Sequence, residues 1–286
     1  MNAFLNILKI SINKFPRLAL VCRTIRDAKQ IVSEPKDTPL GFKFSGSKLM
    51  EEGKFEIKET NIVKEYLSSA DVFINIGANV GYYCCIALAN NVKTVAFEPL
   101  ESNLKYLYAN IRANNWGSNI EIFPIALSKE IGLLELYGGG TGASLVKGWA
   151  GTPDYYKRLV PVSTLDCVLS NRFENKKLFI LVDVEGAELL MLKGADHIVH
   201  MNPKPVWMIE ITVSAHQPEG ITINPDLLTT FRLFWDAGYK AYTADENRRI
   251  IGYEEILAIA NDGDNTLEVH NFLFIDKNVK IEHKEN

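Results

Sequence analysis

The chain is poor in cysteine and has no long apolar run. Four cysteines are present, and they form no CxxC pair and have no histidines at a zinc-binding spacing: Cys22, Cys84, Cys85 and Cys167. We interpret them as reduced, mostly buried thiols rather than as disulfides or metal ligands. No apolar run reaches the roughly 18–20 residues that cross a bilayer. Acidic residues outnumber basic ones, 35 to 31, so a general nucleic-acid binder is not expected either.

Positive charge is concentrated at the N-terminus. Residues 1–30 hold six basic side chains and one acidic side chain, and charges and Pro16 interrupt the apolar patches there. This pattern is typical of neither a signal peptide nor a transmembrane helix. Two interpretations stay open: a helix packed on the domain with a solvated basic side, or a basic segment in peripheral contact with an anionic membrane. We expect a cytoplasmic protein, with the inner membrane face as the second option.

The pattern of apolar residues predicts an α/β fold. From about residue 71, strand-like runs alternate with helical ones, and runs such as FILVDV are almost continuously apolar, as in parallel strands covered on both faces. We expect strands at VFINIG, VKTVAFE, NIEIFPIAL, LFILVDV, PVWMIEI, GYKAYTA and HNFLFID. The result is a doubly wound, mostly parallel sheet. Its strand ends bring four residues to one edge, where such folds bind ligands: Gly77, Glu98, Asp183 and Glu210.

We divide the chain into an N-terminal extension (residues 1–60), a main domain (61–276) and a charged tail (277–286). Glycine and proline interrupt the short alternating stretches of residues 38–60. This pattern predicts that the segment, called the lead-in below, is irregular and contains a small hairpin. The helix after Glu98 is predicted to bury one face, because its apolar residues recur at helical spacing: Leu100, Leu104, Leu107, Tyr108 and Ile111.

A glycine-bearing turn follows the first strand of the sheet. The stretch Phe73–Tyr83 reads FINIGANVGYY, with Gly77 and Gly81 in the turn. A dinucleotide fingerprint needs a middle glycine beside the pyrophosphate, but Asn79 stands there, and no GK[ST] follows. Glu98, 21 positions after Gly77, ends the next strand and offers a carboxylate to ribose hydroxyls. A phosphate-free nucleoside such as S-adenosylmethionine fits both observations.

Five stretches, in this order, resemble the FkbM family of S-adenosylmethionine-dependent methyltransferases: FINIGANVGYY, VAFEP, NIEIFPIALSKEIGLLELYGGG, VPVSTLDCVL and LVDVEGAELLMLKGA. They cover roughly residues 70–211. The resemblance implies a Rossmann-like class I methyltransferase domain with a seven-stranded sheet, which we place at residues 61–276. We expect the N-terminal extension before it to be helical. It also implies methylation of a hydroxyl oxygen, frequently on a sugar or polyketide.

The resemblance further implies which residues bind the cofactor. We expect the glycine loop to hold the methionine part, Glu98 the ribose, the residues after the third strand the adenine, and Asp183 to face the transferred methyl. Asn75 stands where many members have Asp, so it adds no negative charge near the cofactor ammonium. The predicted cofactor residues are Asn75, Gly77, Ala78, Asn79, Gly81, Glu98, Ala126, Leu127, Ser128 and Asp183.

A sugar hydroxyl is a sluggish nucleophile and needs a base. We predict the base among His216, Glu210 and Asp183, which lie at the active edge of the sheet. For His216 the alternative is a surface or hydrogen-bonding role, and for Glu210 it is pairing with a cation. Asp183, Glu185 and Glu188 raise the option of a divalent metal. A helix-capping and dipole role for at least one of the two glutamates is the plainer account, so no metal is predicted.

The stretch YGGGTGASLVKGWAGTPDYY combines a run of glycines with aromatic residues. We predict that it closes over the acceptor, with Lys147, Trp149 and Tyr155 as substrate-binding residues. The alternative is a mobile surface loop whose aromatic residues pack on the domain. The expected function is O-methylation of a small-molecule or glycan acceptor. A non-catalytic nucleoside-binding or scaffold protein and a nicotinamide oxidoreductase are the competing hypotheses, and no oligomeric state is indicated.

Overall fold

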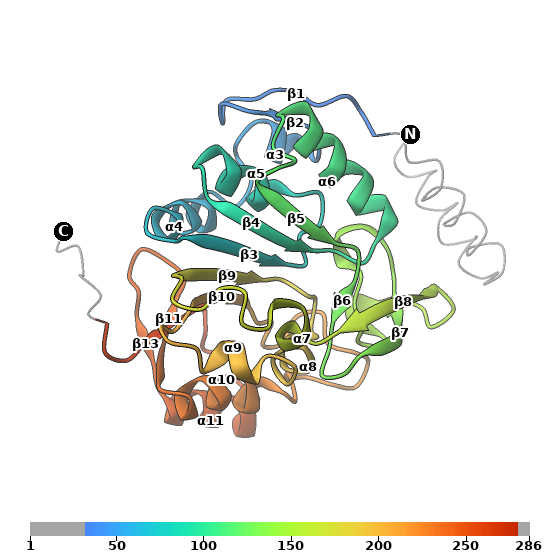
Figure 1. The fold of residues 1–286 in the computed structure, drawn as a ribbon. Coiled ribbons are helices and arrows are strands. Elements are labelled where there is room, and N and C mark those ends of the chain that lie inside the picture. Colours follow the sequence, from blue (N-terminus) through green and yellow to red (C-terminus); the bar gives the residue numbers. More distant parts are fainter. Residues whose placement is uncertain (1–31, 280–286) are drawn as a thin grey trace.

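The computed structural model describes residues 32–279, in which a central eight-stranded sheet lies between two layers of helices (Figure 1). The strands follow the spatial order β12-β11-β13-β10-β9-β3-β4-β5. Their bounds are β3 (Val72–Ile76), β4 (Lys93–Phe97), β5 (Ile120–Phe123), β9 (Leu178–Val182), β10 (Val206–Glu210), β11 (Tyr239–Thr243), β12 (Ile250–Ile251) and β13 (Asn271–Asp276). All seven stretches expected to form strands contribute to this sheet.

The sheet is mixed, which corrects the expectation of seven mostly parallel strands. The strands from β5 to β10 run parallel, whereas β13 runs antiparallel to both of its neighbours, and β12 pairs antiparallel with β11. The crossover from β10 to β11 leaves a gap one strand wide, and β13 fills it in the opposite direction. The eighth strand, β12, has only two residues, too few to produce a periodic signal in the sequence.

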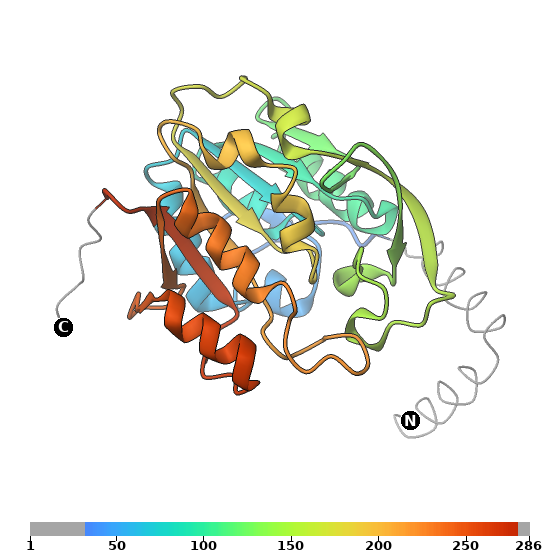
Figure 2. The ribbon, with the colours of Figure 1, turned by 90° about the horizontal axis from the view of Figure 1, so that it is seen from below.

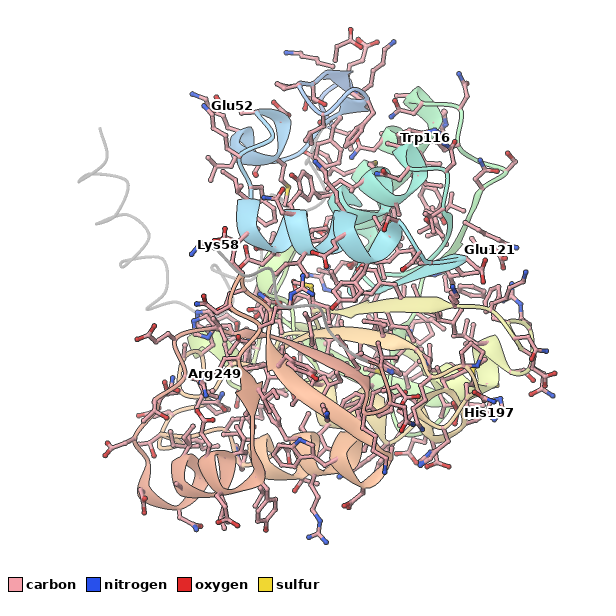
Figure 3. The ribbon with its side chains drawn as sticks, turned by 90° about the vertical axis from the view of Figure 1, so that its left-hand side faces the viewer. Glu52, Lys58, Trp116, Glu121, His197 and Arg249 are labelled. Atoms are coloured by element: carbon pink, nitrogen blue, oxygen red, sulfur yellow. The ribbon has the colours of Figure 1, made fainter. Side chains whose placement is uncertain are left out.

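Two hydrophobic cores lie on the two faces of the sheet. Alternate strand residues feed them: Ile74 and Ile180 face one core, and Phe73 and Phe179 the other. The first layer consists of α3 (Lys48–Glu51), α4 (Ile57–Leu67), α5 (Tyr82–Ala89) and α6 (Glu101–Ala113). The second consists of α7 (Leu165–Leu169), α8 (Glu188–Leu192), α9 (Asp196–Val199), α10 (Leu227–Asp236) and α11 (Tyr253–Asp262), as Figure 2 shows from below. In the side view of Figure 3, Trp116 marks the first layer and His197 the second.

The helix α6 buries most of the face predicted for it. Leu104, Leu107 and Ile111 are buried, with Leu100 at the N-cap. Tyr108, however, is 43% exposed. Consecutive helical residues are rotated by about 100°, so Tyr108 falls off the face that its neighbour Leu107 occupies.

The lead-in packs on the first helix layer. A hairpin of β1 (Lys36–Asp37) and β2 (Lys43–Phe44) is present, and Phe42, Phe44 and Met50 are buried in the same core as α4 and α5. The boundary predicted after residue 60 falls inside α4, and the division of the chain stays a prediction. Residues 1–31 and 280–286 lie outside the described residues, and with them the helical extension, the basic segment and most of the tail. No helix within residues 32–279 has both the length and the hydropathy to cross a bilayer.

A separate three-stranded sheet, not predicted from the sequence, adjoins the ends of the parallel strands (Figure 1). Its order is β6 (Ala126–Leu127), β8 (Lys157–Ser163) and β7 (Gly132–Tyr137). The stretch NIEIFPIAL is divided at Pro124, so its first half forms β5 and its second half β6. A small core of its own holds this sheet beside α6: Leu100, Ala126, Leu136, Val160 and Val162.

Replacing Phe234 with Ala should lower the free energy of unfolding by about 3–5 kcal/mol. This side chain is fully buried in α10, and its ring stacks on Phe274 at a centroid distance of 4.0 Å. Leu159→Ala, at a residue that is 66% exposed, is the control and should change stability by less than about 0.5 kcal/mol. Urea unfolding measures both, and equal losses in the two variants would contradict this description of the core.

Candidate functional site

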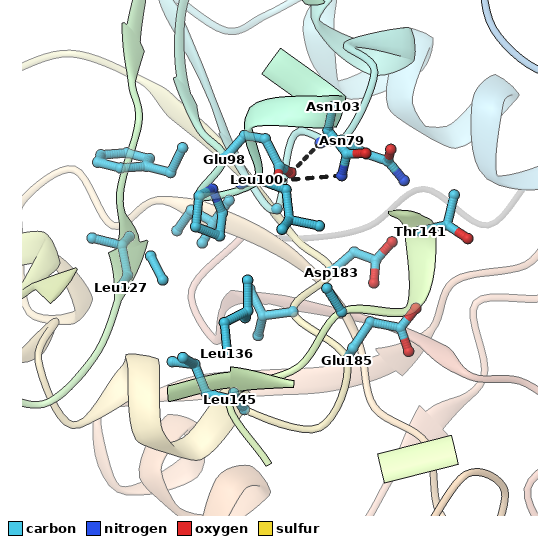
Figure 4. Close-up of a pocket in the computed structure, with 18 of the residues that line it drawn as sticks. Asn79, Glu98, Leu100, Asn103, Leu127, Leu136, Thr141, Leu145, Asp183 and Glu185 are labelled. Carbon is cyan, nitrogen blue, oxygen red and sulfur yellow. Dashed lines mark hydrogen bonds between the residues drawn. The ribbon is translucent and has the colours of Figure 1, made fainter. Parts of the chain in front are cut away.

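The carboxyl ends of four adjacent strands meet at one edge of the sheet. Gly77 follows β3, Glu98 follows β4, Asp183 follows β9, and Glu210 is the last residue of β10. Between this edge and the three-stranded sheet lies a pocket of about 570 Å³, part of which is open to solvent (Figure 4). Ligands usually bind at such places in α/β sheets.

The pocket has an apolar end and an acidic end. In Figure 4, Leu127, Leu136 and Leu145 gather at one end, and Asp183 and Glu185 stand toward the other. No Lys, Arg or His is among the described residues that line the pocket. A flat apolar group and a cation therefore suit the two ends better than an anion does.

Glu98 is fixed at the centre of the site by three donors. Its Oε2 accepts a hydrogen bond from the Asn79 N–H at 2.8 Å, and its Oε1 accepts from the Leu100 N–H at 2.8 Å and from Asn103 Nδ2 at 3.2 Å. The side chain is only 4% exposed, and burial raises its pKa to about 7 although these hydrogen bonds oppose the rise. A carboxylate oxygen can accept two hydrogen bonds. Oε2 therefore keeps one lone pair for a ligand.

The two loop glycines are required by contacts within the protein. Gly77 has φ +82°, and a Cβ there would lie 1.8 Å from the carbonyl oxygen of Asp183. Gly81 has φ +86°, and a Cβ there would lie 2.3 Å from Leu107 of α6. A side chain at Gly77 would separate the strand ends, and one at Gly81 would displace the side chain of Leu107. The loop thus brings Asn79 to Glu98 by packing tightly on its neighbours.

The structure brings most of the predicted cofactor residues together. Six line the pocket: Gly77, Asn79, Glu98, Ala126, Leu127 and Asp183. Asn75 and Ala78 line an adjoining pocket on the other side of the glycine loop. Gly81 and Ser128 are buried and line neither of these two pockets.

The predicted catalytic carboxylates influence each other. Burial, followed by the charges of Glu210 and Glu185, raises the pKa of Asp183 well above its usual range. Burial raises the pKa of Glu210 to about 7, and Glu185 adds to the rise. His216, by contrast, is exposed, and its ring meets the edge of Trp149 at 6.0 Å between centroids. Neither His216 nor Glu210 is among the residues that line the two pockets, whereas Asp183 lines both.

The glycine-rich insertion is fastened to the segment after β9. Trp149 is only 2% exposed, and its Nε1 donates a hydrogen bond to Glu185 Oε2 at 2.8 Å. One face of the indole lies against Gly186, where a Cβ would come within 2.4 Å of the ring. In this arrangement that face is not open to a sugar. Lys147 is exposed and pairs with Asp154 at 2.8 Å, Tyr155 is partly exposed, and the acceptor role of the insertion stays a prediction.

The two glutamates considered for metal binding have separate surroundings. Glu188 is 3% exposed and its Oε1 accepts a hydrogen bond from the Gly186 N–H at 2.8 Å, just before α8. Glu185 has φ +54° and lines the pocket. Within residues 32–279, no group of three or more His, Cys, Asp or Glu side chains is arranged to hold a metal ion.

The pocket residues that the sequence analysis did not predict include Asn103, Leu136, Thr141 and Leu145. Asn103 lies between Leu100 and Leu104 on the buried face of α6, and a polar residue on an apolar face is a usable signal. The others come from the three-stranded sheet and its loops, whose position beside the main sheet no local pattern indicates.

All the described residues that line the first pocket lie within the segment that a protein-family model matches. Residues 75–241, more than half of the chain, match the model of the methyltransferase FkbM domain. No curated protein matches the sequence.

Several solved structures are similar to this chain at low identity. A methyltransferase FkbM from Methylobacillus flagellatus KT aligns with a TM-score of 0.43 and 19% identity over 72% of this chain and 44% of that protein. This chain therefore spans less than half of that protein. A putative O-methyltransferase from Klebsiella pneumoniae aligns with a TM-score of 0.44 and 8% identity over 77% of this chain and 80% of that protein. Cofactor-bound Rv0187 from MTB aligns with a TM-score of 0.41 and 9% identity over 78% of this chain and 80% of that protein.

The burial of Glu188 predicts a pH dependence of stability. Its folded pKa of about 8 exceeds the ordinary value of 4.5, so its contribution to stability is fully present below about pH 4.5 and is lost as the pH rises through 8. Glu188→Gln keeps an acceptor for Gly186 but does not titrate. The difference in the free energy of unfolding between variant and wild type should thus grow in the variant's favour from pH 5 to 8, by up to about 1.4 kcal/mol per pH unit.

Urea unfolding at pH 5, 6, 7 and 8 measures this difference. Glu130→Gln is the matched control, since its side chain is 66% exposed, and its difference from wild type should stay constant. A Glu188→Gln difference that is also constant with pH would contradict the assignment.

Proposed function

We propose that this chain, which belongs to the methyltransferase FkbM family, is a methyltransferase that transfers a methyl group from S-adenosylmethionine to a hydroxyl of a sugar or glycan precursor. The observation that carries the cofactor proposal is Glu98, a buried carboxylate that lines the pocket and whose Oε2 accepts only one hydrogen bond among the described residues. A carboxylate at the end of the second parallel strand is suited to accept the hydroxyl groups of a ribose.

The pocket's two ends support the same ligand. The leucine-lined end suits an adenine ring, and the end at Asp183 and Glu185 suits a positively charged sulfonium. A nicotinamide dinucleotide would bring a pyrophosphate to a pocket lined by carboxylates and by no described basic side chain, which disfavours the oxidoreductase hypothesis.

S-adenosylmethionine supplies a methyl group on a sulfonium, which a hydroxyl oxygen can attack directly. The chain's own residues have to position the acceptor, exclude water and hold the proton that the hydroxyl loses. Glu210, with a pKa of about 7, suits the last task near neutral pH. Burial and the charge of Glu210 raise the pKa of Asp183, which favours its protonated form.

The acceptor class is inferred from the family resemblance and from the insertion that borders the acidic end. A cytoplasmic protein with peripheral membrane contact through residues 1–30 remains part of the proposal, and that segment lies outside the described residues. A non-catalytic nucleoside-binding protein is the second candidate, and the observation that favours it is Asn75 in place of an acidic residue. Methyl transfer to any acceptor would exclude it.

Glu98→Ala should weaken the binding of S-adenosylmethionine roughly thirtyfold, or by about 2 kcal/mol, because the ribose hydroxyls would lose a buried acceptor. Isothermal titration calorimetry measures the change. Glu101→Gln, on the exposed first turn of α6, is the control and should bind like wild type. Unchanged binding by Glu98→Ala, or binding of NADH by the wild type, would refute the assignment of the pocket.

Glu210→Gln should reduce the rate of methyl transfer by about a hundredfold or more, with little change in cofactor affinity. The assay follows a radiolabelled methyl group from S-adenosylmethionine into a panel of sugars and sugar nucleotides. If the rate of methyl transfer falls in His216→Gln and stays at the wild-type value in Glu210→Gln, His216 is the base.

A further inference from the structure

A second pocket, of about 360 Å³, adjoins the first at the glycine loop. The two share Gly77, Asn79 and Asp183 among their lining residues. The second pocket extends toward the first helix layer, where its wall is formed by the start of α5 and by the segment just before α4. A ligand that fills the first pocket and passes the loop would therefore enter the second.

The second pocket contains a buried acceptor without a donor. Asn75 is 1% exposed, and its Nδ2 donates to Cys84 Sγ at 3.4 Å, whereas its Oδ1 has no hydrogen-bond partner. Asn79 Oδ1, also at this pocket, has none either. A buried carbonyl oxygen without a donor costs about 1–3 kcal/mol. Such atoms are normally satisfied by water or by a ligand, so the pocket suits a group that carries N–H donors.

Acidic side chains line the second pocket. Glu56 and Asp183 line it, and no Lys, Arg or His is among its described lining residues. Tyr83 donates its hydroxyl to Glu56 Oε2 at 2.6 Å, which fixes the carboxylate, and Glu56 remains exposed on the open side. Burial and the nearby charge of Glu59 raise the pKa of Glu56 although the hydrogen bond opposes the rise. A cation would relieve this repulsion.

We propose that the second pocket binds the amino acid part of S-adenosylmethionine, with Glu56 as the carboxylate that pairs with its ammonium group and Asn75 Oδ1 as a second acceptor. The inference rests on the proposed function and extends it to a residue outside the segment that matches the family. The amino acid's own carboxylate is accommodated as well, because α5 begins at this pocket without a side-chain cap and its first N–H groups favour an anion.

This assignment explains how the site manages without an acidic residue at position 75. The charge is supplied from position 56 instead, 19 positions earlier in the chain, and both side chains line one pocket. Glu56 itself has φ +42°, a conformation that costs free energy for a residue with a side chain. Glu56 is the N-cap residue of α4, and its backbone conformation places the carboxylate beside Tyr83.

The test compares three ligands by isothermal titration calorimetry. S-adenosylmethionine and S-adenosylhomocysteine carry the amino acid, whereas 5′-methylthioadenosine has the same nucleoside without it. Glu56→Gln keeps an acceptor for Tyr83 but removes the charge. This variant should bind S-adenosylmethionine and S-adenosylhomocysteine more weakly by similar factors, roughly 10- to 100-fold. Its affinity for 5′-methylthioadenosine should be unchanged. Glu101→Gln removes the same charge from an exposed site and should change none of them.

Tyr83→Phe is the second variant. It leaves the charge of Glu56 but removes the hydrogen bond that fixes it, so a smaller loss is expected for the two amino acid ligands and none for 5′-methylthioadenosine. Unchanged binding of 5′-methylthioadenosine also shows that each variant is folded.

The outcomes separate this inference from the proposed function. If the wild type binds S-adenosylmethionine but Glu56→Gln binds it equally well, Glu56 is not its partner and the inference is overturned alone. Equal weakening of all three ligands would mean that Glu56 supports the fold, and that also overturns it. If the wild type binds none of the three, the proposed cofactor fails and the inference with it.

Discussion

The site depends on the hydrogen bonds of Glu98. One carboxylate accepts from the loop after β3, from the backbone at the start of α6 and from a side chain on α6. Those contacts hold the glycine loop, the strand end and the helix in one arrangement. They also require the tight packing at Gly77 and Gly81, because the loop reaches Glu98 only if the Asp183 carbonyl and Leu107 can approach its backbone.

A second constraint is the negative charge at the same edge. Asp183, Glu188 and Glu210 lie at or near the ends of neighbouring strands, and burial raises the pKa of each. Holding several carboxyl groups together without a cation costs stability at neutral pH. A ligand with positive charge reduces that cost on binding. The same charges thus lower the stability of the free protein and favour a cationic cofactor.

The sequence was sufficient for the positions of seven strands along the chain and for the edge at which four of them end. Near-continuous apolar runs and a glycine turn are local signals, and so is a carboxylate such as Glu98 at the end of a strand. The direction of β13 and the two-residue strand β12 have no local signal, because they depend on the gap left by the β10 to β11 crossover. Glu56 was missed for a similar reason, since only the packing of the lead-in on α5 brings it to Tyr83.

The insertion shows what local reasoning leaves open. The composition of YGGGTGASLVKGWAGTPDYY allowed both a segment that closes over the acceptor and a loop whose aromatic residues pack on the domain. In the structure, Trp149 is buried against Gly186 and bonded to Glu185. The glycine after Glu185 creates the space that the indole fills. A pairing between two segments more than 30 positions apart is a tertiary contact, and composition alone does not reveal it.

The central claim is that one extended ligand spans both pockets across the glycine loop. A crystal structure of the protein with S-adenosylhomocysteine tests it most directly. The account predicts ribose hydroxyls on Glu98, adenine among the leucines, and the ammonium group at Glu56 and Asn75. A ligand whose amino acid part turns away from Glu56 into solvent, or whose ribose does not touch Glu98, would contradict it.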